Sequence, residues 1–352
     1  MAESLLTPEV KAYVGHQSRP HTNRFPISEE MIFELADAIE DPNPLFLDAV
    51  YARNSRFGGL LCPQLAAWKD WAPRIDYFGA AQDSHFQVPL PFKSYGFNGG
   101  SKWTFHRPVR VGDLITKTEK IVDISERPGR TGHLVFIARE ITQSNQKGEA
   151  LLTIRHTSIF RKRAETEVED KPELPGPVNL PRMSPPERGE VVEKQKWIAP
   201  PQRTFDQVNV GDEITPVVKG PMTTGHLVRW ASANGNYARI HWDLPYAMLR
   251  QGLPNVVVNG SLKNEYLYIL LQRFAGEAGW VREMYLEHRG QDHPGDTLII
   301  TGKVTEKTER DGFGYVKCEI ALRNERGQTS QGWAQVVVPK HGQSLPLVWN
   351  QD

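Results

Sequence analysis

The stretch HRPVRVGDLI at residues 106–115, followed by KIVDISER at 120–127, returns later in the chain as HRGQDHPGDTLII at 288–300 and KVTEKTER at 303–310. Each copy contains a His-Arg pair, a Gly-Asp turn, a β-branched run and a second run that ends in Glu-Arg. β-Branched residues favour strands, and Gly-Asp favours a turn. An internal repeat of this kind indicates a chain built from two similar units.

The parallel continues downstream of both copies. Two strand-like runs, at 132–141 and 314–323, lead into the turns NQKGE (145–149) and NERGQ (324–328), where Gly can supply a left-handed backbone position. A final strand follows in each half, and we expect these strands at Ala150–Phe160 and Thr329–Val338.

Helical spacing of apolar residues appears upstream of each copy. The segments 28–39 and 223–233 both show it, with Ser28 as a suitable N-cap in the first, and a clearer stripe predicts a helix over 261–275. Each half is therefore predicted to be helix, loop, helix and antiparallel strands, which is an α+β arrangement. Two unrelated small α+β domains are the alternative, but the matched order of turn signals would then be a coincidence.

We expect a first half at residues 1–165, an irregular Pro- and Glu-rich linker at 166–195, and a second half at 196–352. The 352 residues are enough for two domains that each bury a core.

Lys plus Arg and Asp plus Glu both total 42, so no global charge attracts nucleic acid or an anionic membrane. Secretory-signal and membrane-spanning patterns are missing from the sequence, which favours a cytoplasmic protein.

The two cysteines, Cys62 and Cys318, are far apart and fit buried reduced thiols rather than a disulfide framework. His, Cys, Asp and Glu residues show no metal-ligand spacing that can be read from the sequence. We therefore expect no metal site.

The segment FELADAIEDPNPLF at 33–46 has a recognisable order of residues. It resembles the signature of MaoC-type acyl-CoA hydratases/dehydratases, an aromatic residue and a short helix followed by Asp-x-Asn-Pro-Leu/Ile-His. Asp41, Asn43 and Leu45 match this signature, and Phe46 stands where the signature has histidine. The segments 58–63 and 105–113 also resemble the parts that surround the central helix in this family.

The second half keeps the histidine and changes the acid. In NYARIHWD at 236–243, Asn236 replaces the usual Asp and His241 follows at the signature's spacing. This form, with GLPNVVVNGS at 252–261, looks like the branch that contains mesaconyl-CoA and related hydratases. The resemblance covers nearly the whole chain. It implies a tandem (double) hotdog fold, in which each half is an antiparallel sheet wrapped around a central helix.

Hydration of an enoyl thioester needs a base, an acid, and a group that polarises the carbonyl. His241 suits the proton transfers because its ordinary pKa is near neutral, while the amide of Asn236 can orient water or substrate but cannot act as a carboxylate base. Gly260 can donate its N–H from the start of the helix to the thioester oxygen. Asp41 and Ser261 are secondary candidates. Each of these residues also has a purely structural interpretation, which for Asp41 is the stronger one.

The first half is predicted to hold a wide acyl pocket. Its helix from Gln64 has to stop before Pro73, which leaves room under the sheet. Candidate lining residues, which could equally just fill this space, are Trp68, Trp71, Tyr77 and Phe86. Arg239 and Arg250 are candidates for CoA phosphates or else ordinary surface charges.

The function favoured by the resemblance is an acyl-CoA hydratase/dehydratase acting on a bulky, branched or carboxylated 2-enoyl thioester. Coenzyme A is then part of the substrate, and no other cofactor is expected. Two alternatives stay open: a thioesterase, for which Glu265 is the available carboxylate, and a non-catalytic acyl-thioester-binding subunit that needs a partner. A homodimer is expected by resemblance, and a hetero-partner is the alternative.

Overall fold

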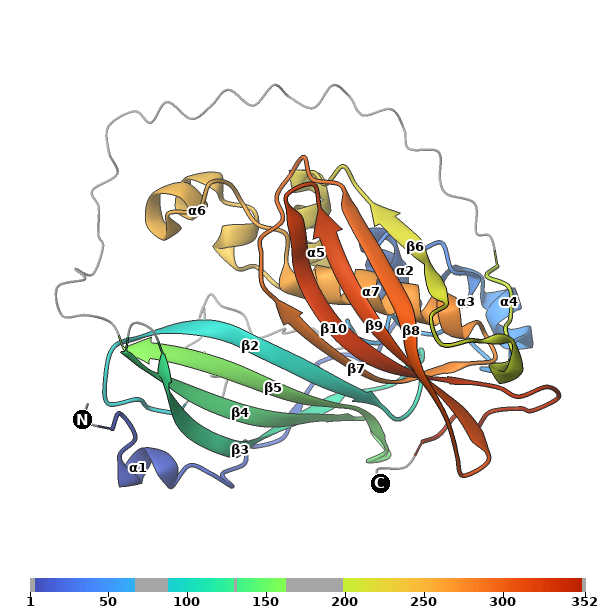
Figure 1. The fold of residues 1–352 in the computed structure, drawn as a ribbon, viewed down its shortest axis with the longest axis horizontal. Helices are drawn as coiled ribbons and strands as arrows, with labels where there is room; N and C mark the ends of the chain where they lie inside the picture. The colour runs from blue at the N-terminus through green and yellow to red at the C-terminus, as the bar shows by residue number, and fades with distance from the viewer. Residues whose placement is uncertain (1–3, 67–87, 130–131, 163–198, 350–352) are drawn as a thin grey trace.

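The computed structural model describes residues 4–66, 88–129, 132–162 and 199–349. Its centre is one ten-stranded sheet in the order β1-β3-β4-β5-β2-β7-β10-β9-β8-β6 (Figure 1). The strands are β1 (His21–Thr22), β2 (Ser94–Phe105), β3 (Thr116–Gly129), β4 (Gly132–Ser144), β5 (Ala150–Lys162), β6 (Glu213–Lys219), β7 (Trp280–His288), β8 (Leu298–Arg310), β9 (Phe313–Asn324) and β10 (Gly327–Val338). Every strand pair is antiparallel, as the repeat predicted.

The described helices are mostly short, and in each half most of them lie between the first strand and the other four. They are α1 (Pro8–Lys11), α2 (Glu29–Ala38), α3 (Pro44–Leu47), α4 (Ala49–Asn54), η1 (Phe205–Gln207), α5 (Thr224–Asn234), η2 (Arg239–His241), α6 (Leu244–Gln251) and α7 (Gly260–Ala275). The predicted N-cap is confirmed, because Ser28 Oγ accepts the backbone N–H of Met31 at 3.1 Å. Thr223 caps α5 in the same way.

The two halves meet along one pair of strands. Strands β1 to β5 come from the first half and β6 to β10 from the second, and β2 pairs with β7 between Ser101↔Leu286 and Thr104↔Glu283. This arrangement is the tandem hotdog that the resemblance implied. The predicted linker at 166–195 lies outside the described residues, so the domain limits stay a prediction.

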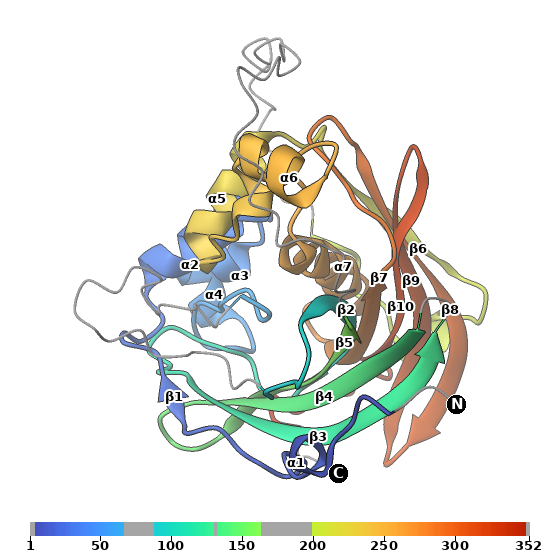
Figure 2. The same ribbon diagram turned by 90° about the vertical axis from the view of Figure 1, so that its left-hand side faces the viewer.

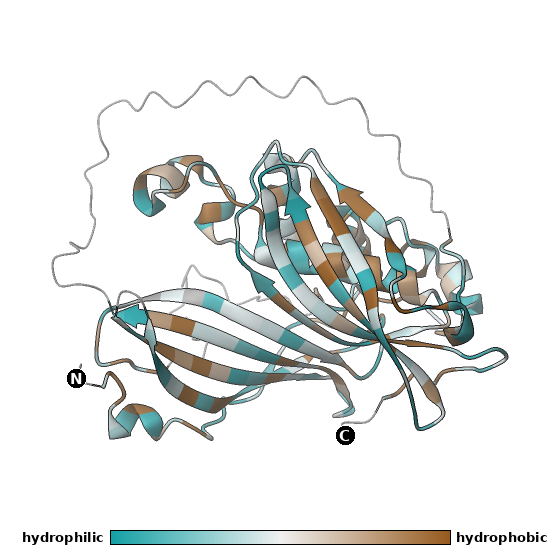
Figure 3. Cartoon of the chain, in the orientation of Figure 1, coloured by the Kyte–Doolittle hydropathy of each residue, from teal (hydrophilic) through white to brown (hydrophobic). Residues whose placement is uncertain are grey.

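Helix α7 is the central helix of the second half. The sheet curves around it, and it contacts all five strands of that half, β6 to β10 (Figure 2). Eleven of its sixteen residues are buried, including Tyr266, Leu270 and Phe274 of the predicted stripe. Hydrophobic and hydrophilic residues alternate along the strands of both halves, as expected for a sheet with one covered face (Figure 3).

The structure corrects the register of the internal repeat by one residue. The sequence suggested that His106-Arg107 matches His288-Arg289, but the hydrogen bonds match His106 to Arg289. His106 N and Arg107 N both donate to Leu151 O, whereas Arg289 N and Gly290 N both donate to Thr329 O. The second copy has one more residue between its His-Arg pair and its Gly-Asp turn. Aligning the Gly-Asp turns gives the structural match.

Charged side chains tie the halves together beyond the sheet. Arg56, just after α4, donates to Ala278 O at 2.5 Å and to Leu345 O at 2.6 Å. Lys219, at the end of β6, donates to the carbonyls of Ile39 and Glu40 at the C-terminus of α2, at 2.9 and 2.7 Å. A cation at this end of a helix interacts favourably with the helix dipole.

Replacing Arg56 with Met should lower the free energy of unfolding by about 2 kcal/mol, because carbonyl groups of the second half lose a charged donor. The measurement is urea unfolding followed by circular dichroism. Arg53→Met, an exposed change in the last turn of α4, is the matched control and should change stability little. Equal stability of the two variants would show that the Arg56 contacts do not hold the halves together.

Candidate functional site

His241 is the last residue of η2 and is buried, with 8% of its surface exposed. Its Nδ1 lies 2.8 Å from the carbonyl oxygen of Val257. A carbonyl can only accept a hydrogen bond, so Nδ1 carries the proton and Nε2 of the neutral ring has a free lone pair. Burial lowers the pKa of His241, although the bond to Val257 opposes this shift. The ring is therefore a neutral base at neutral pH.

The start of α7 lies immediately after the residues that hold His241. Val257 N donates to Ile240 O at 3.1 Å, and α7 begins three residues later at Gly260. The first hydrogen bond within the helix runs from Lys263 N to Asn259 O at 3.1 Å. The N–H groups of Gly260, Ser261 and Leu262 precede that bond, so they are available to an oxygen with developing negative charge.

Two further candidates sit beside this helix start. Ser261 Oγ accepts the indole N–H of Trp230 at 3.0 Å, which links α7 to α5. Asn236 Oδ1 accepts the N–H of Ala238 at 3.4 Å, a bond that shapes the loop before η2. The structure thus links His241 to the segment that leads into Gly260, and it places Asn236 in the loop before η2.

Asn259 was not singled out from the sequence. It is fully buried directly before α7, and both polar atoms of its side chain lack a hydrogen-bond partner within the described part of the chain. An unpaired buried amide costs free energy, which makes it a candidate to contact a ligand.

Asp41 lines a separate cavity at the equivalent loop of the first half. This cavity contains about 950 Å³ of empty space, its open mouth included, and Asp41, Gln64, Tyr268 and Arg273 are among its lining residues. Arg273 Nη2 lies 3.5 Å from Asp41 Oδ1. Burial raises the pKa of Asp41, while the charges of Arg273 and Lys219 oppose that shift. Arg273 is 13 residues from Gly260, or about 20 Å along α7, so this cavity is distinct from the surroundings of His241.

Glu265 points from α7 toward the first half and is 1% exposed. Burial and the nearby charge of Asp41 raise the pKa of Glu265 to about 8, against the effect of the backbone N–H groups of Ala66 and Leu65. The side chain is therefore protonated at neutral pH. A buried, neutral carboxyl cannot activate water as a base, which argues against the thioesterase alternative.

The remaining predictions have mixed outcomes. Arg239 is engaged locally, because Nη2 and Nε lie 2.6 and 2.9 Å from Asp243 Oδ2. Arg250, near the end of α6, is half-buried. The aromatic residues predicted to line an acyl pocket lie outside the described residues: Trp68, Trp71, Tyr77 and Phe86.

Within the described ranges, no group of three or more His, Cys, Asp or Glu side chains is placed to hold a metal ion. None of the described helices has the length and apolar character needed to cross a bilayer.

Comparisons with known proteins identify relatives of this arrangement. Residues 12–154 match the family model "FAS1-like, dehydratase domain region". A mesaconyl-C(4)-CoA hydratase from Chloroflexus aurantiacus is 28% identical over 206 residues, which are 57% of this chain and 60% of that protein. The chain therefore spans less than two thirds of that relative. A UPF0336 protein from Streptomyces avermitilis is 30% identical over 41% of this chain and 89% of its own length.

Solved structures show the same fold. A MaoC-like dehydratase superposes with a TM-score of 0.67 and 19% identity, covering 94% of this chain and 99% of that one. A double hotdog protein from Mycobacterium tuberculosis superposes with a TM-score of 0.57 and 13% identity, covering 92% and 96% of the two chains.

Glu265 should make the protein less stable as the pH rises from 4.5 to 8. In this window the folded chain keeps a proton that the unfolded chain releases, so the free energy of unfolding falls by up to about 1.4 kcal/mol per pH unit. Glu265→Gln should remove that slope, and urea unfolding at a series of pH values measures it. Glu213→Gln, an exposed change, is the control. An unchanged slope in Glu265→Gln would contradict the raised pKa.

Proposed function

This chain belongs to the MaoC-like hydratase/dehydratase family and has two hotdog domains, and we propose that it adds or removes water at the 2,3-double bond of an acyl-CoA. The observation that supports this proposal is the neutral imidazole of His241, which donates to Val257 O three residues before the first N–H group of α7. A base beside a set of preorganised donors is what enoyl thioester chemistry requires.

In the proposed reaction, Nε2 of His241 takes a proton from water as the oxygen adds to the β-carbon. The electrons move toward the thioester oxygen, which Gly260 N–H stabilises as an enolate. The imidazolium then returns its proton to the α-carbon, so atoms and charge balance. Asn236 orients the water or the thioester. Asn259 is a further candidate for the ligand contact, because its buried amide otherwise stays unpaired.

The substrate is proposed to be a bulky, branched or carboxylated enoyl-CoA. The likeness to a mesaconyl-C(4)-CoA hydratase supports a carboxylated acyl group. Arg250 is a better candidate than Arg239 for a CoA phosphate, because Asp243 already neutralises Arg239.

A binding subunit is the second candidate function. Both motif copies are incomplete, since Phe46 replaces the histidine of the first and Asn236 the acid of the second. Such a subunit would bind an acyl-CoA without turnover and become active when a second protein, or a second copy of this chain, is added.

Turnover of a panel of enoyl-CoA esters (crotonyl, mesaconyl, a branched medium-chain and a bulky cyclic ester) should be seen as loss of the conjugated thioester absorbance. His241→Ala should reduce kcat by a factor of about 10²–10⁴, because the base is gone. His341→Ala, an exposed histidine, is the matched control and should leave kcat unchanged. Binding without turnover by the unaltered protein would favour the subunit, and release of free thiol would indicate a thioesterase.

The oxyanion role of Gly260 can be tested at one position. Proline is tolerated at the first residue of a helix, and Asn259 before it has the extended backbone (φ −58°, ψ 131°) that proline requires. Gly260→Pro therefore removes the N–H, while Gly260→Ala keeps it and adds the same Cβ near His288. The proline variant should have a kcat about 10²–10³ lower than the alanine variant. Equal kcat values would remove Gly260 from the mechanism.

A further inference from the structure

The extended segment Val256–Val258 lies between His241 and the loop that joins β7 to β8. Its peptide groups alternate in direction, as in a strand. Toward His241, Val257 donates its N–H to Ile240 O and accepts the imidazole Nδ1–H. Toward the loop, Val258 N donates to Asp292 O at 2.8 Å, and Val256 O accepts His293 Nδ1–H at 2.9 Å. The position of His241 therefore depends on where residues 292 and 293 are held.

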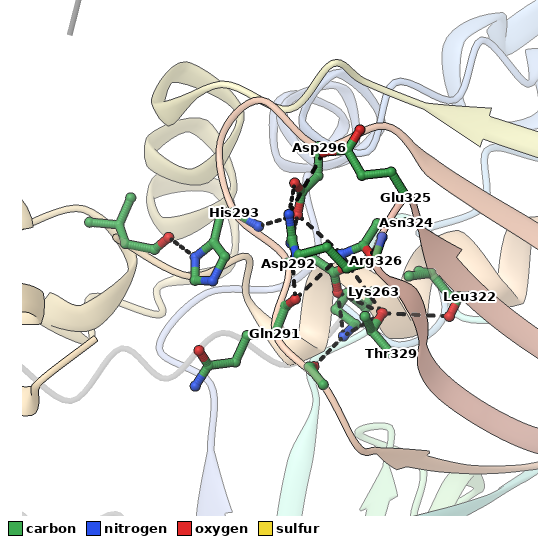
Figure 4. A network of polar contacts seen from close by, with 12 residues as sticks. Lys263, Gln291, Asp292, His293, Asp296, Leu322, Asn324, Glu325, Arg326 and Thr329 are labelled. Carbon is green, nitrogen blue, oxygen red and sulfur yellow. Dashed lines mark hydrogen bonds and ion pairs between the residues drawn. The ribbon is translucent and has the colours of Figure 1, made fainter. Parts of the chain in front are cut away.

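A buried ion pair fixes that loop to α7. Lys263 Nζ lies 2.6 Å from Asp292 Oδ2, and the two side chains are 3% and 0% exposed. Thr329 Oγ1 and Asn324 Nδ2 donate to the same carboxylate, at 2.9 to 3.0 Å (Figure 4). Lys263 also donates to Gly290 O at 3.3 Å. Because α7 starts one turn before Lys263, a single carboxylate anchors both the helix start and the segment that holds His241.

The first half provides an internal comparison. Its Cys62 N donates to Val109 O, which matches the bond from Val258 N to Asp292 O, so Val109 occupies the place of Asp292. Leu151 occupies the place of Thr329, because both carbonyls accept the equivalent pair of N–H groups. The half with Phe46 in place of the histidine thus has apolar residues at the places of Asp292 and Thr329, although buried Gln64 bonds Val109 N and Arg107 O there.

Other parts of the network occur in both halves. Asp113 Oδ2 accepts Arg110 N at 2.9 Å, and Asp296 Oδ2 accepts His293 N at 2.8 Å, so both aspartates cap the same turn. Asn145 and Asn324 both accept the N–H of the residue two positions later. These shared contacts are sufficient to make the turns. Asp292 and Thr329 are additions that accompany the histidine.

We infer that Lys263 and Asp292 are a positioning pair that sets the spacing between the imidazole of His241 and the N–H groups at the start of α7. This inference rests on the proposed function for its catalytic consequence. The geometry it describes can be measured without turnover. The carboxylate of this pair occurs in the half with the histidine and is replaced by Val109 in the other.

Asp292→Asn keeps the size of the side chain and removes its charge. We expect kcat for the best enoyl-CoA of the panel to fall by about 10²-fold, since small displacements of catalytic groups have effects of this size. KM should change by less than about threefold, because the loss is confined to the transition state. In ¹⁵N-histidine NMR titrations, the pKa of His241, assigned with His241→Ala, should rise toward its ordinary value as the ring becomes less buried.

Asp113→Asn in the first half is the control, because it removes the charge of a loop aspartate that caps the turn matching the one capped by Asp296. If Asp292→Asn and Asp113→Asn give the same His241 titration and the same kcat as the unaltered protein, the positioning role is wrong. If Asp292→Asn shifts the titration but the unaltered protein turns over no ester, the positioning role stands and the proposed hydratase function fails.

An unpaired Lys263 could prevent Asp292→Asn from folding, since a buried charge without its partner is strongly destabilising. The double variant Lys263→Met with Asp292→Asn removes both charges and avoids that cost. It should fold and show the same shift of the His241 titration and the same fall in kcat. A double variant with unchanged titration and kcat would overturn the inference.

Discussion

The pairing of β2 with β7 is the contact on which the rest of the structure depends. Four residue pairs, from Ser101↔Leu286 to Thr104↔Glu283, join two five-stranded sheets into one. An exposed sheet edge carries unpaired N–H and C=O groups, so this pairing removes one such edge from each half. It also sets the halves close enough for α2 to pack against α5 and for Lys219 and Arg273 to reach residues of the first half.

The two halves share a backbone and differ in a coordinated set of side chains. His241, Gly260 and Asp292 in the second half correspond to Phe46, Gln64 and Val109 in the first. Such changes are expected to occur together. Removing one partner of a buried polar contact leaves the other unsatisfied at a large cost, whereas replacing both with apolar groups can be nearly neutral.

Much of the fold could be predicted from the sequence, because it is encoded locally. Ser28 as N-cap, the helix ending at Ala275 and the glycine of the 145–149 turn all follow from single-residue preferences. The repeat register was off by one because one residue is added before the second Gly-Asp turn. In a strand such a slip moves a side chain to the other face, so His106 and His288 are not equivalent.

Candidate site residues could be predicted where they belong to a sequence motif. Their hydrogen-bond partners could not be predicted where these are backbone groups. The motif identified His241, but nothing in the side-chain pattern indicates Val257 O as its hydrogen-bond acceptor. The burial of Lys263 and Glu265 was also not predictable, because polar residues on a helix usually indicate an exposed face. The ion pair of Arg239 with Asp243, in contrast, has the i,i+4 spacing of a local helical contact and could have been expected.

Helix α7 supports both halves, and the charges of its first turns explain how they differ. Lys263 and Glu265 are two residues apart, so they point in nearly opposite directions, about 200° around the axis. Lys263 faces the loop of its own half, where Asp292 compensates its charge. Glu265 faces Leu65 and Ala66 of the first half, and because it has no ion pair within the described part of the chain it stays protonated at neutral pH. Charge-assisted hydrogen bonds, such as those of an ion pair, are stronger than those of a neutral carboxyl. They therefore fix the positions of buried polar groups more firmly. The first turns of the same helix therefore present an ion pair to the loop behind His241 and a neutral carboxyl to the first half.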